Sequence, residues 1–231
     1  MRTVSFIGLC SSIPCLCPFL PLSSRDLKPD NILLDERGHA HLTDFNIAVH
    51  YSDRRLLNGV AGSMAYMAPE ILAKRGYTYT IDWWSLGVCT YELLFGRRPF
   101  RGKTNSDLTH AISKDSLRFP EDADRKCSRA GMQVIKGVSL LSPFLPHSLI
   151  PTKLLERDPT KRLACKSGEG FDEIRQHPWF QPIDWEALEN KQLTPPFTPD
   201  VRSLFMRPFS PSVMFSLCSP LLPTPVQKGE L

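Results

Sequence analysis

Residues 25–31 read RDLKPDN, and the stretch 44–46, which reads DFN, follows after twelve intervening residues. The residues between the two stretches predict a β-hairpin, because apolar runs flank a polar turn whose Gly38 can adopt a left-handed conformation. Residues 44–70 have few periodic apolar positions and many Gly, Ser and Asn, which predicts a long loop. Loops of that length are uncommon unless they are functional.

A second feature is the stretch 80–95, TIDWWSLGVCTYELLF, which is apolar on almost every side. A helix without a polar face is expected in the middle of a domain, and Gly96 suits its C-terminal end. The sequence therefore predicts a mainly α fold with one short β-hairpin. Weaker patterns predict further helices near 106–114, 128–137, 153–156 and 170–176.

Composition places the chain among ordinary globular proteins. Its 231 residues are 42% hydrophobic and 23% charged, with a formal net charge of +4. The sequence contains no basic run, so a nucleic-acid partner is not expected. The seven cysteines are scattered without metal-ligand spacing, which favours reduced thiols in a cytoplasmic protein.

Three segments, 1–24, 138–152 and 201–231, differ from the rest of the chain in composition. They hold 11 of the 21 prolines but only five charged residues in 70, against 47 in the other 161. We interpret them as translated non-coding sequence, disordered or loosely placed. Segment 1–24 has a rival interpretation as a secretory signal, because Arg2 precedes an apolar run and small residues. Its three prolines disfavour both a signal helix and a membrane span.

Four short motifs follow one another along the chain. In this order and spacing they resemble the C-terminal lobe of a eukaryotic protein kinase. Each motif alone is weak, whereas four in register are specific. The resemblance implies that residues 25–200 form a protein-kinase C-lobe, with 138–152 as an insertion. The motifs are RDLKPDN at 25–31, DF at 44–45, APE at 68–70 and DWWSLG at 82–87.

The resemblance implies phosphoryl transfer, in which a protein mostly positions groups and neutralises charge. It implies that Asp26 accepts the proton of a substrate hydroxyl and that Lys28, typical of serine/threonine kinases, steadies the γ-phosphate of ATP. Asn31 and Asp44 would supply the oxygen ligands that Mg²⁺ prefers. The implied substrate is a Ser or Thr of another protein. In the rival interpretation, Asp26 and Asn31 only cap turns.

Other residues are implied to support this centre. Glu70 is expected to pair with Arg162, which would tie the end of the long loop to a later part of the chain. Asp82 is expected to accept backbone N–H groups of the catalytic loop from within the buried helix.

Three residues are implied to lie near the activation loop or the substrate. Ser63 occupies the place where such kinases hold a hydroxyl near the catalytic Asp and Lys. Asp30 and Glu92 are expected either to meet a basic substrate residue or to be solvated surface carboxylates.

Further stretches narrow the subgroup. The double Trp at 83–84, HPWF at 177–180 and IDWEALENKQLTPPFTPD at 183–200 resemble the AGC kinases and the start of their C-terminal tail. Within that group, Asn after Asp-Phe resembles the YANK subgroup, whose normal residue here is Asn. Asn46 is expected to adopt the left-handed backbone that this position often needs and to restrict movements of Phe45.

The sequence also departs from the family pattern. Ser24 stands where a His usually precedes Arg25, and Gly59 stands where many AGC kinases carry a phosphorylated Thr, so Arg25 is expected to lack that phosphate. Nothing before Arg25 resembles an N-terminal lobe with its Gly-rich loop, strand Lys and partner Glu. We therefore expect a truncated kinase that is inactive alone. The alternative is a non-catalytic binding module that docks substrates.

Overall fold

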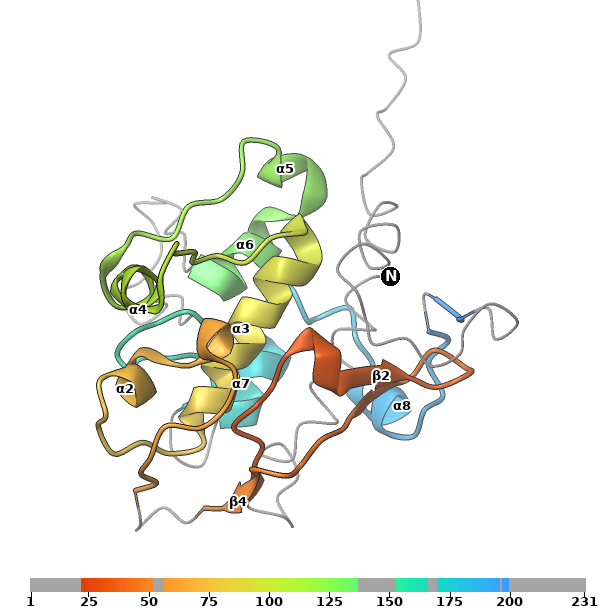
Figure 1. Ribbon diagram of the computed structural model, residues 1–231. Helices are drawn as coiled ribbons and strands as arrows, with labels where there is room; N and C mark the ends of the chain where they lie inside the picture. Colours follow the sequence, from red (N-terminus) through yellow and green to blue (C-terminus); the bar gives the residue numbers. More distant parts are fainter. Residues whose placement is uncertain (1–21, 52–55, 137–152, 166–169, 196, 200–231) are drawn as a thin grey trace, which may run out of the picture.

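The computed structural model describes residues 22–51, 56–136, 153–165, 170–195 and 197–199. Apart from residues 22–24, the three segments of unusual composition lie outside this part of the chain. Figure 1 shows helix α3 (Thr80–Phe95) running through the middle of the molecule, with other helices around it and short strands at one end. The predicted mainly α fold is confirmed, but besides the one predicted β-hairpin the structure has a second strand pair, Leu22–Ser23 with Val49–His50.

The other helices of the described part are short. They are α2 (Pro69–Leu72), α4 (Asn105–Lys114), α5 (Ala123–Lys126), α6 (Arg129–Lys136), α7 (Gly170–Gln176) and α8 (Trp185–Glu189), with the 3₁₀ turns η2 (Pro29–Asn31) and η3 (Met64–Tyr66). Two antiparallel strand pairs complete the fold: β1 (Leu22–Ser23) with β4 (Val49–His50), and β2 (Ile32–Leu34) with β3 (Ala40–Leu42).

Most predicted elements are present. Helices α3 and α7 have the predicted bounds, and Gly96 ends α3 with a left-handed φ of 69°. The β2–β3 pair is the predicted hairpin, and its turn contains Gly38 with a φ of 91°.

The predicted helix at 153–156 is wrong. This stretch instead runs beside the end of α6, where the Leu154 and Leu155 amides donate to the carbonyls of Val134 and Ile135 at 2.8 and 3.2 Å. Lys153 also forms a parallel bridge with Arg162.

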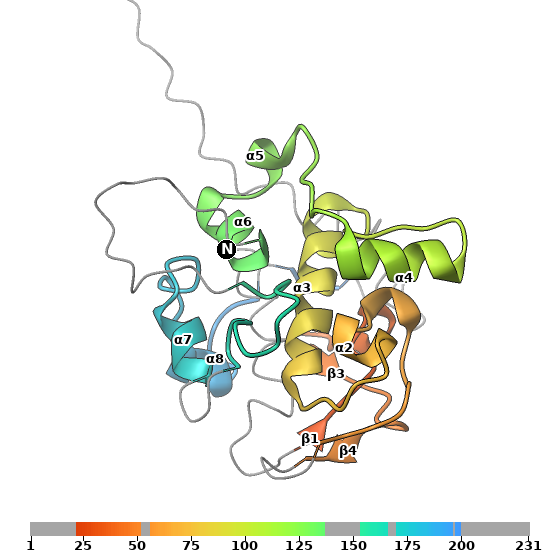
Figure 2. The ribbon, with the colours of Figure 1, turned by 90° about the vertical axis from the view of Figure 1, so that its left-hand side faces the viewer.

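Two apolar clusters meet at α3, which explains why this helix has no polar face. Trp83 and Leu86 belong to a cluster that includes residues of α7 and α8, whereas Trp84 and Val88 belong to one that includes residues of α2 and α4. Figure 2 shows the same arrangement, with α7 and α8 on one side of α3 and α2 and α4 on the other. Helix α3 is therefore a rigid support for any loop that is bound to it.

The helices and the cysteines of the described part can be compared with what the sequence predicts. None of its helices has both the length and the apolar character needed to cross a membrane. Cys89 is a buried thiol within helix α3, and Cys165 is a partly buried thiol.

Candidate functional site

The loop 24–31, called the catalytic loop from here on after the kinase-like motif that it contains, is fixed to α3 through one buried carboxylate. Asp82, in the first turn of α3, has no exposed surface and accepts hydrogen bonds from the backbone N–H of Ser24 at 2.8 Å and of Arg25 at 3.0 Å. These are the backbone contacts that the sequence predicts. The Ser23 hydroxyl adds a third donor at 2.9 Å. Burial raises the pKa of Asp82 to about 6 in spite of these three donors.

Asp26 lies at the centre of the site. Its Oδ2 is 2.7 Å from Lys28 Nζ, and its Oδ1 accepts the backbone N–H of Ser63 at 2.8 Å. Lys28 Nζ also donates to the Ser63 hydroxyl at 3.0 Å. Burial alone would raise the pKa of Asp26, but the hydrogen bonds from Lys28 and Ser63 outweigh it and hold this pKa below its ordinary value. Asp26 is therefore an ionised acceptor at neutral pH.

Asn31 connects Asp26 to the stretch that carries Asp44. Asn31 Nδ2 donates to the Asp26 carbonyl at 2.9 Å and to Asp26 Oδ2 at 3.2 Å, which leaves Oδ1 as the oxygen that the amide offers to a ligand. The Asn31 carbonyl accepts the Thr43 N–H at 2.8 Å and the Thr43 hydroxyl at 3.1 Å. The residue after Thr43 is Asp44, so the hairpin brings the two oxygen-bearing side chains into one region.

The stretch 44–46 is exposed at the surface of the described part. Asp44, Phe45 and Asn46 all have accessible side chains, and Phe45 is 43% exposed. The left-handed residue is Asp44, with a φ of 58°, so the expectation that Asn46 adopts this conformation is wrong. Aspartate, like asparagine, tolerates the left-handed region better than most residues.

The long loop 44–70, called the activation segment from here on, returns to the catalytic loop at Gly62. This glycine has a φ of 103°, and an added Cβ would lie 2.3 Å from the Arg25 carbonyl oxygen. Only glycine therefore lets the backbone approach closely enough for Ser63 to bind Asp26 and Lys28.

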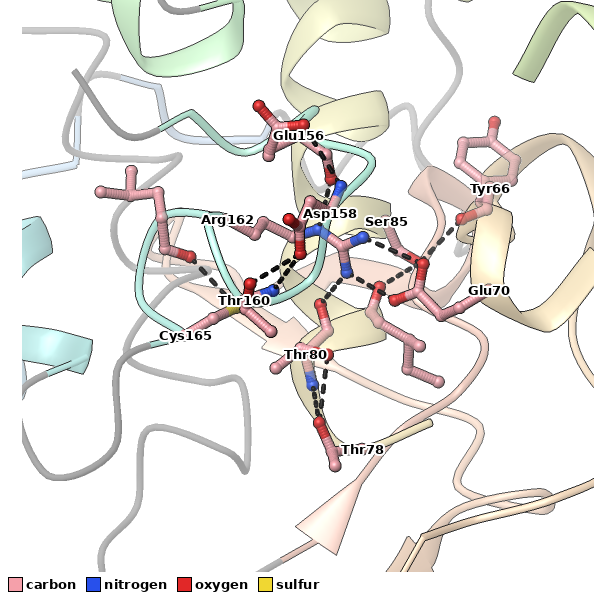
Figure 3. A network of polar contacts seen from close by, with 12 residues as sticks. Tyr66, Glu70, Thr78, Thr80, Ser85, Glu156, Asp158, Thr160, Arg162 and Cys165 are labelled. Atoms are coloured by element: carbon pink, nitrogen blue, oxygen red, sulfur yellow. Dashed lines mark hydrogen bonds and ion pairs between the residues drawn. The ribbon is translucent and has the colours of Figure 1, made fainter. Parts of the chain in front are cut away.

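A buried network ties the end of the activation segment to residues 153–165 (Figure 3). Arg162 Nη1 and Nη2 donate to the Glu70 carboxylate at 2.8 and 3.0 Å, and this is the ion pair that the sequence predicts. Arg162 also donates to the carbonyls of Thr80 at 2.8 Å and Glu156 at 2.9 Å, and it lies over the ring of Trp84 at 5.4 Å. Arg162 is fully buried and Glu70 is 7% exposed, so their charges compensate each other away from water.

The two remaining predicted carboxylates have different surroundings. Asp30 is exposed in η2. Glu92 is 8% exposed in α3 and accepts the Tyr66 hydroxyl at 2.5 Å, so the alternative of a solvated carboxylate is wrong for Glu92. Burial, followed by this hydrogen bond, raises the pKa of the Tyr66 phenol.

Sequence reasoning missed two side chains that hold the site in place. The Ser23 hydroxyl binds Asp82, although composition places Ser23 in a segment that is predicted to be foreign to the fold. Tyr77 Oη accepts a hydrogen bond from Arg25 at 3.2 Å. These partners lie 59 and 52 positions away in the sequence, and no short motif contains either pair.

Comparison with known proteins gives matches that include this site. Residues 22–180 match the family described as "Protein kinase domain". The chain is 37% identical over 178 residues to serine/threonine-protein kinase AtPK1/AtPK6 of Arabidopsis thaliana, covering 77% of this chain and 33% of that protein. It is 38% identical over 178 residues to serine/threonine-protein kinase Sgk1 of Fundulus heteroclitus, and this match covers 77% of this chain and 36% of that protein. It is 36% identical over 191 residues to G protein-coupled receptor kinase 4 of Mus musculus, and this match covers 79% of this chain and 29% of that protein. The chain thus spans about a third of the length of these relatives.

Proposed function

Because the chain belongs to the protein kinase domain family, we propose that it carries the part of a serine/threonine kinase that transfers the γ-phosphate of ATP to a protein hydroxyl. The observation that carries the proposal is the arrangement of Asp26, Lys28 and Ser63, in which a carboxylate, an ammonium group and a hydroxyl lie within hydrogen-bond distance. The serine/threonine kinases among its relatives support the same substrate class.

In this proposal Asp26 accepts the proton of the substrate hydroxyl as its oxygen attacks the γ-phosphorus. The hydrogen bonds that lower the pKa of Asp26 keep it ionised, and its contacts with Lys28 and Ser63 fix its orientation. Lys28 places a positive charge beside Asp26, where it can steady the transferred phosphate. The proton moves from the substrate oxygen to Asp26 while the bond between the γ-phosphorus and the β,γ-bridging oxygen breaks, with ADP as the leaving group.

Asn31 and Asp44 are the residues proposed to hold Mg²⁺. Both offer hard oxygen atoms, and the Thr43 contacts with the Asn31 carbonyl link the stretches that carry them. The bound ion would neutralise charge on the phosphates. No group of three or more His, Cys, Asp and Glu forms a metal centre in the described part, so this donor set fits an ion shared with phosphate better than a protein-only cage.

Glu92 and Asp30 are proposed to contact a basic residue of the substrate. Glu92 accepts the Tyr66 hydroxyl through Oε2, so its carboxylate has a fixed position, whereas Asp30 is exposed on the catalytic loop. We further propose that the chain belongs to the YANK-like subgroup of the AGC kinases, on the basis of Asn46 after Asp-Phe and the stretch 183–200.

The kinase-like part is proposed to extend from residue 22 to residue 200, with 138–152 as an insertion. The start is placed three residues earlier than the sequence alone indicates, because β1 pairs with β4 and Ser23 binds Asp82. The 231 residues contain no Gly-rich phosphate loop. We therefore propose that residues 22–200 alone do not transfer phosphate and that they need a phosphate-binding lobe to do so.

The test uses the chain alone and a chimera. Residues 22–200 are fused behind the N-terminal ATP-binding half of the Sgk1 relative, and phosphate transfer from labelled ATP to a degenerate Ser/Thr peptide library is measured. We expect transfer by the chimera, loss of at least about a hundredfold in the Asp26→Asn variant, and none from the chain alone. Asp124→Asn, an exposed carboxylate on α5, is the matched control.

Two results would contradict these proposals. Transfer by the isolated chain that Asp44→Ala abolishes would show that the chain is active alone. A folded chimera that binds the peptides without transferring phosphate, and that Mg²⁺-ATP does not stabilise against heat, would favour the non-catalytic binding module.

A further inference from the structure

One hydroxyl joins the catalytic loop to the activation segment. Tyr77 lies just before α3 and is 3% exposed. Its Oη accepts a hydrogen bond from Arg25 Nη1 at 3.2 Å and donates to the Gly59 carbonyl at 3.0 Å, while the Asn58 carbonyl is farther away at 3.5 Å. A phenol is a donor and an acceptor at once, so it can link a cation to a carbonyl.

The backbone of Tyr77 binds the same part of the activation segment. The Leu57 N–H donates to the Tyr77 carbonyl at 2.8 Å, and the Tyr77 N–H donates to the Leu57 carbonyl at 3.0 Å. These two bonds form an isolated antiparallel bridge. Residues 57–59 are therefore bound to Tyr77 by two backbone hydrogen bonds and by its hydroxyl group.

Arg25 is held on its other side by the beginning of the activation segment. Its Nε donates to the Ile47 carbonyl at 2.7 Å, and its backbone N–H is bound by Asp82. Arg25 directly precedes Asp26, and it has a left-handed φ of 61°. The guanidinium thus connects the residue before Asp26 to two separate parts of the activation segment, through the Ile47 carbonyl and through Tyr77.

We propose that Tyr77 is a positioning residue that holds residues 57–59 against Arg25 without the help of a phosphate group. Gly59 has no hydroxyl that could carry a phosphate, and the Gly59 carbonyl already reaches Arg25 through the Tyr77 phenol. The order of this part of the activation segment then does not depend on phosphorylation. The role in positioning rests on the proposed kinase function, but the contact itself can be tested without catalysis.

The test is hydrogen exchange in the complete 231-residue chain, comparing wild type with Tyr77→Phe. This substitution removes only the oxygen that binds Arg25 and Gly59. We expect exchange of the amides at 57–62 to become at least about fivefold faster. Tyr91→Phe is the matched control, because Tyr91 is also buried and its hydroxyl donates one hydrogen bond, to the Arg118 carbonyl at 2.7 Å, far along the sequence from Arg25.

Two further comparisons separate a positioning role from a general loss of stability. In the Arg25→Met background, Tyr77→Phe should change the exchange at 57–62 less than in wild type, because one of its two partners is already gone. Phosphatase treatment of the chain, produced in eukaryotic cells, should leave that exchange unchanged.

Three outcomes would overturn the proposal: unchanged exchange at 57–62 in Tyr77→Phe, the same acceleration in Tyr91→Phe, or faster exchange after phosphatase treatment. If the chimera proves inactive while the exchange results hold, the proposed kinase function fails and the contact between Tyr77 and Arg25 stands.

Discussion

Replacing Arg162 by Met should destabilise the fold more than any comparable change at the surface. The substitution keeps most of the aliphatic stem but removes the four hydrogen bonds that Arg162 donates to Glu70, Thr80 and Glu156. It leaves the Glu70 carboxylate buried without its cation. Breaking a buried ion pair in this way costs about 3–5 kcal/mol. A domain is stable by only about 5–15 kcal/mol, so the loss is a large share of the total.

The assay is urea unfolding of the chain, followed by tryptophan fluorescence. With a slope of about 1–3 kcal/mol per molar urea, a loss of about 3–5 kcal/mol should lower the Arg162→Met midpoint by about 1–5 M. Lys161→Met is the matched control, because Lys161 pairs with Asp158 at 3.4 Å but is 75% exposed, and its loss should cost less than about 1 kcal/mol.

A double-mutant cycle isolates the pair itself. Glu70→Gln alone should also destabilise, since it leaves the Arg162 charge buried without a countercharge. The double variant Glu70→Gln/Arg162→Met should then lose about 2 kcal/mol less than the sum of the two single losses. A midpoint for Arg162→Met equal to that of Lys161→Met, or strict additivity in the cycle, would refute this reasoning.

Three other substitutions have defined outcomes. Burial raises the pKa of Asp82 from 3.8 to about 6, so the folded state binds a proton more readily than the unfolded chain. When the pH falls from 7 to 4.5, the unfolding free energy of the wild type should therefore rise by about 2 kcal/mol relative to that of Asp82→Asn. A difference between the two proteins in urea unfolding that does not change with pH would contradict this. Ser24→Ala should raise the unfolding free energy by about 1 kcal/mol, because the buried Ser24 hydroxyl has no hydrogen-bond partner among the described residues; a loss of that size would reveal one. Gly87→Ala places a Cβ 2.8 Å from Leu154 and 2.9 Å from Leu155, so overpacking of about 1–3 kcal/mol should exceed the gain in helix propensity, and a higher thermal midpoint would disprove it.

The sequence predicts those features whose cause is local. Helix α3 has the predicted bounds because its residues are apolar on every side and Gly96 ends the last turn. A local pattern predicts a helix at 153–156, but the amides of Leu154 and Leu155 instead donate to the carbonyls of Val134 and Ile135. Such a preference depends on tertiary contacts, which a propensity cannot contain.

In the candidate site, too, features with a local cause are predicted and features that depend on distant partners are not. The side chains of Asp26, Lys28 and Asn31 lie within one short motif, and the structure brings Lys28 and Asn31 into contact with Asp26. Ser23 and Tyr77 escaped prediction because Ser and Tyr are ordinary residues whose roles come only from distant partners. The expectation for Asn46 is wrong for another reason. The left-handed backbone conformation occurs two residues earlier, at Asp44.

The segment 77–82, which leads into α3 and forms its first turn, organises the site, because three of its residues bind three different parts of the chain. Tyr77 binds the activation segment and Arg25, the Thr80 carbonyl accepts Arg162, and Asp82 binds the backbone before Asp26. Since α3 is buried in two apolar clusters, these anchors cannot shift without disturbing the core. Loss of the Arg162 anchor should therefore lower global stability, whereas loss of the Tyr77 hydroxyl should release only the activation segment. The catalytic loop is then positioned by the same helix that holds the core together.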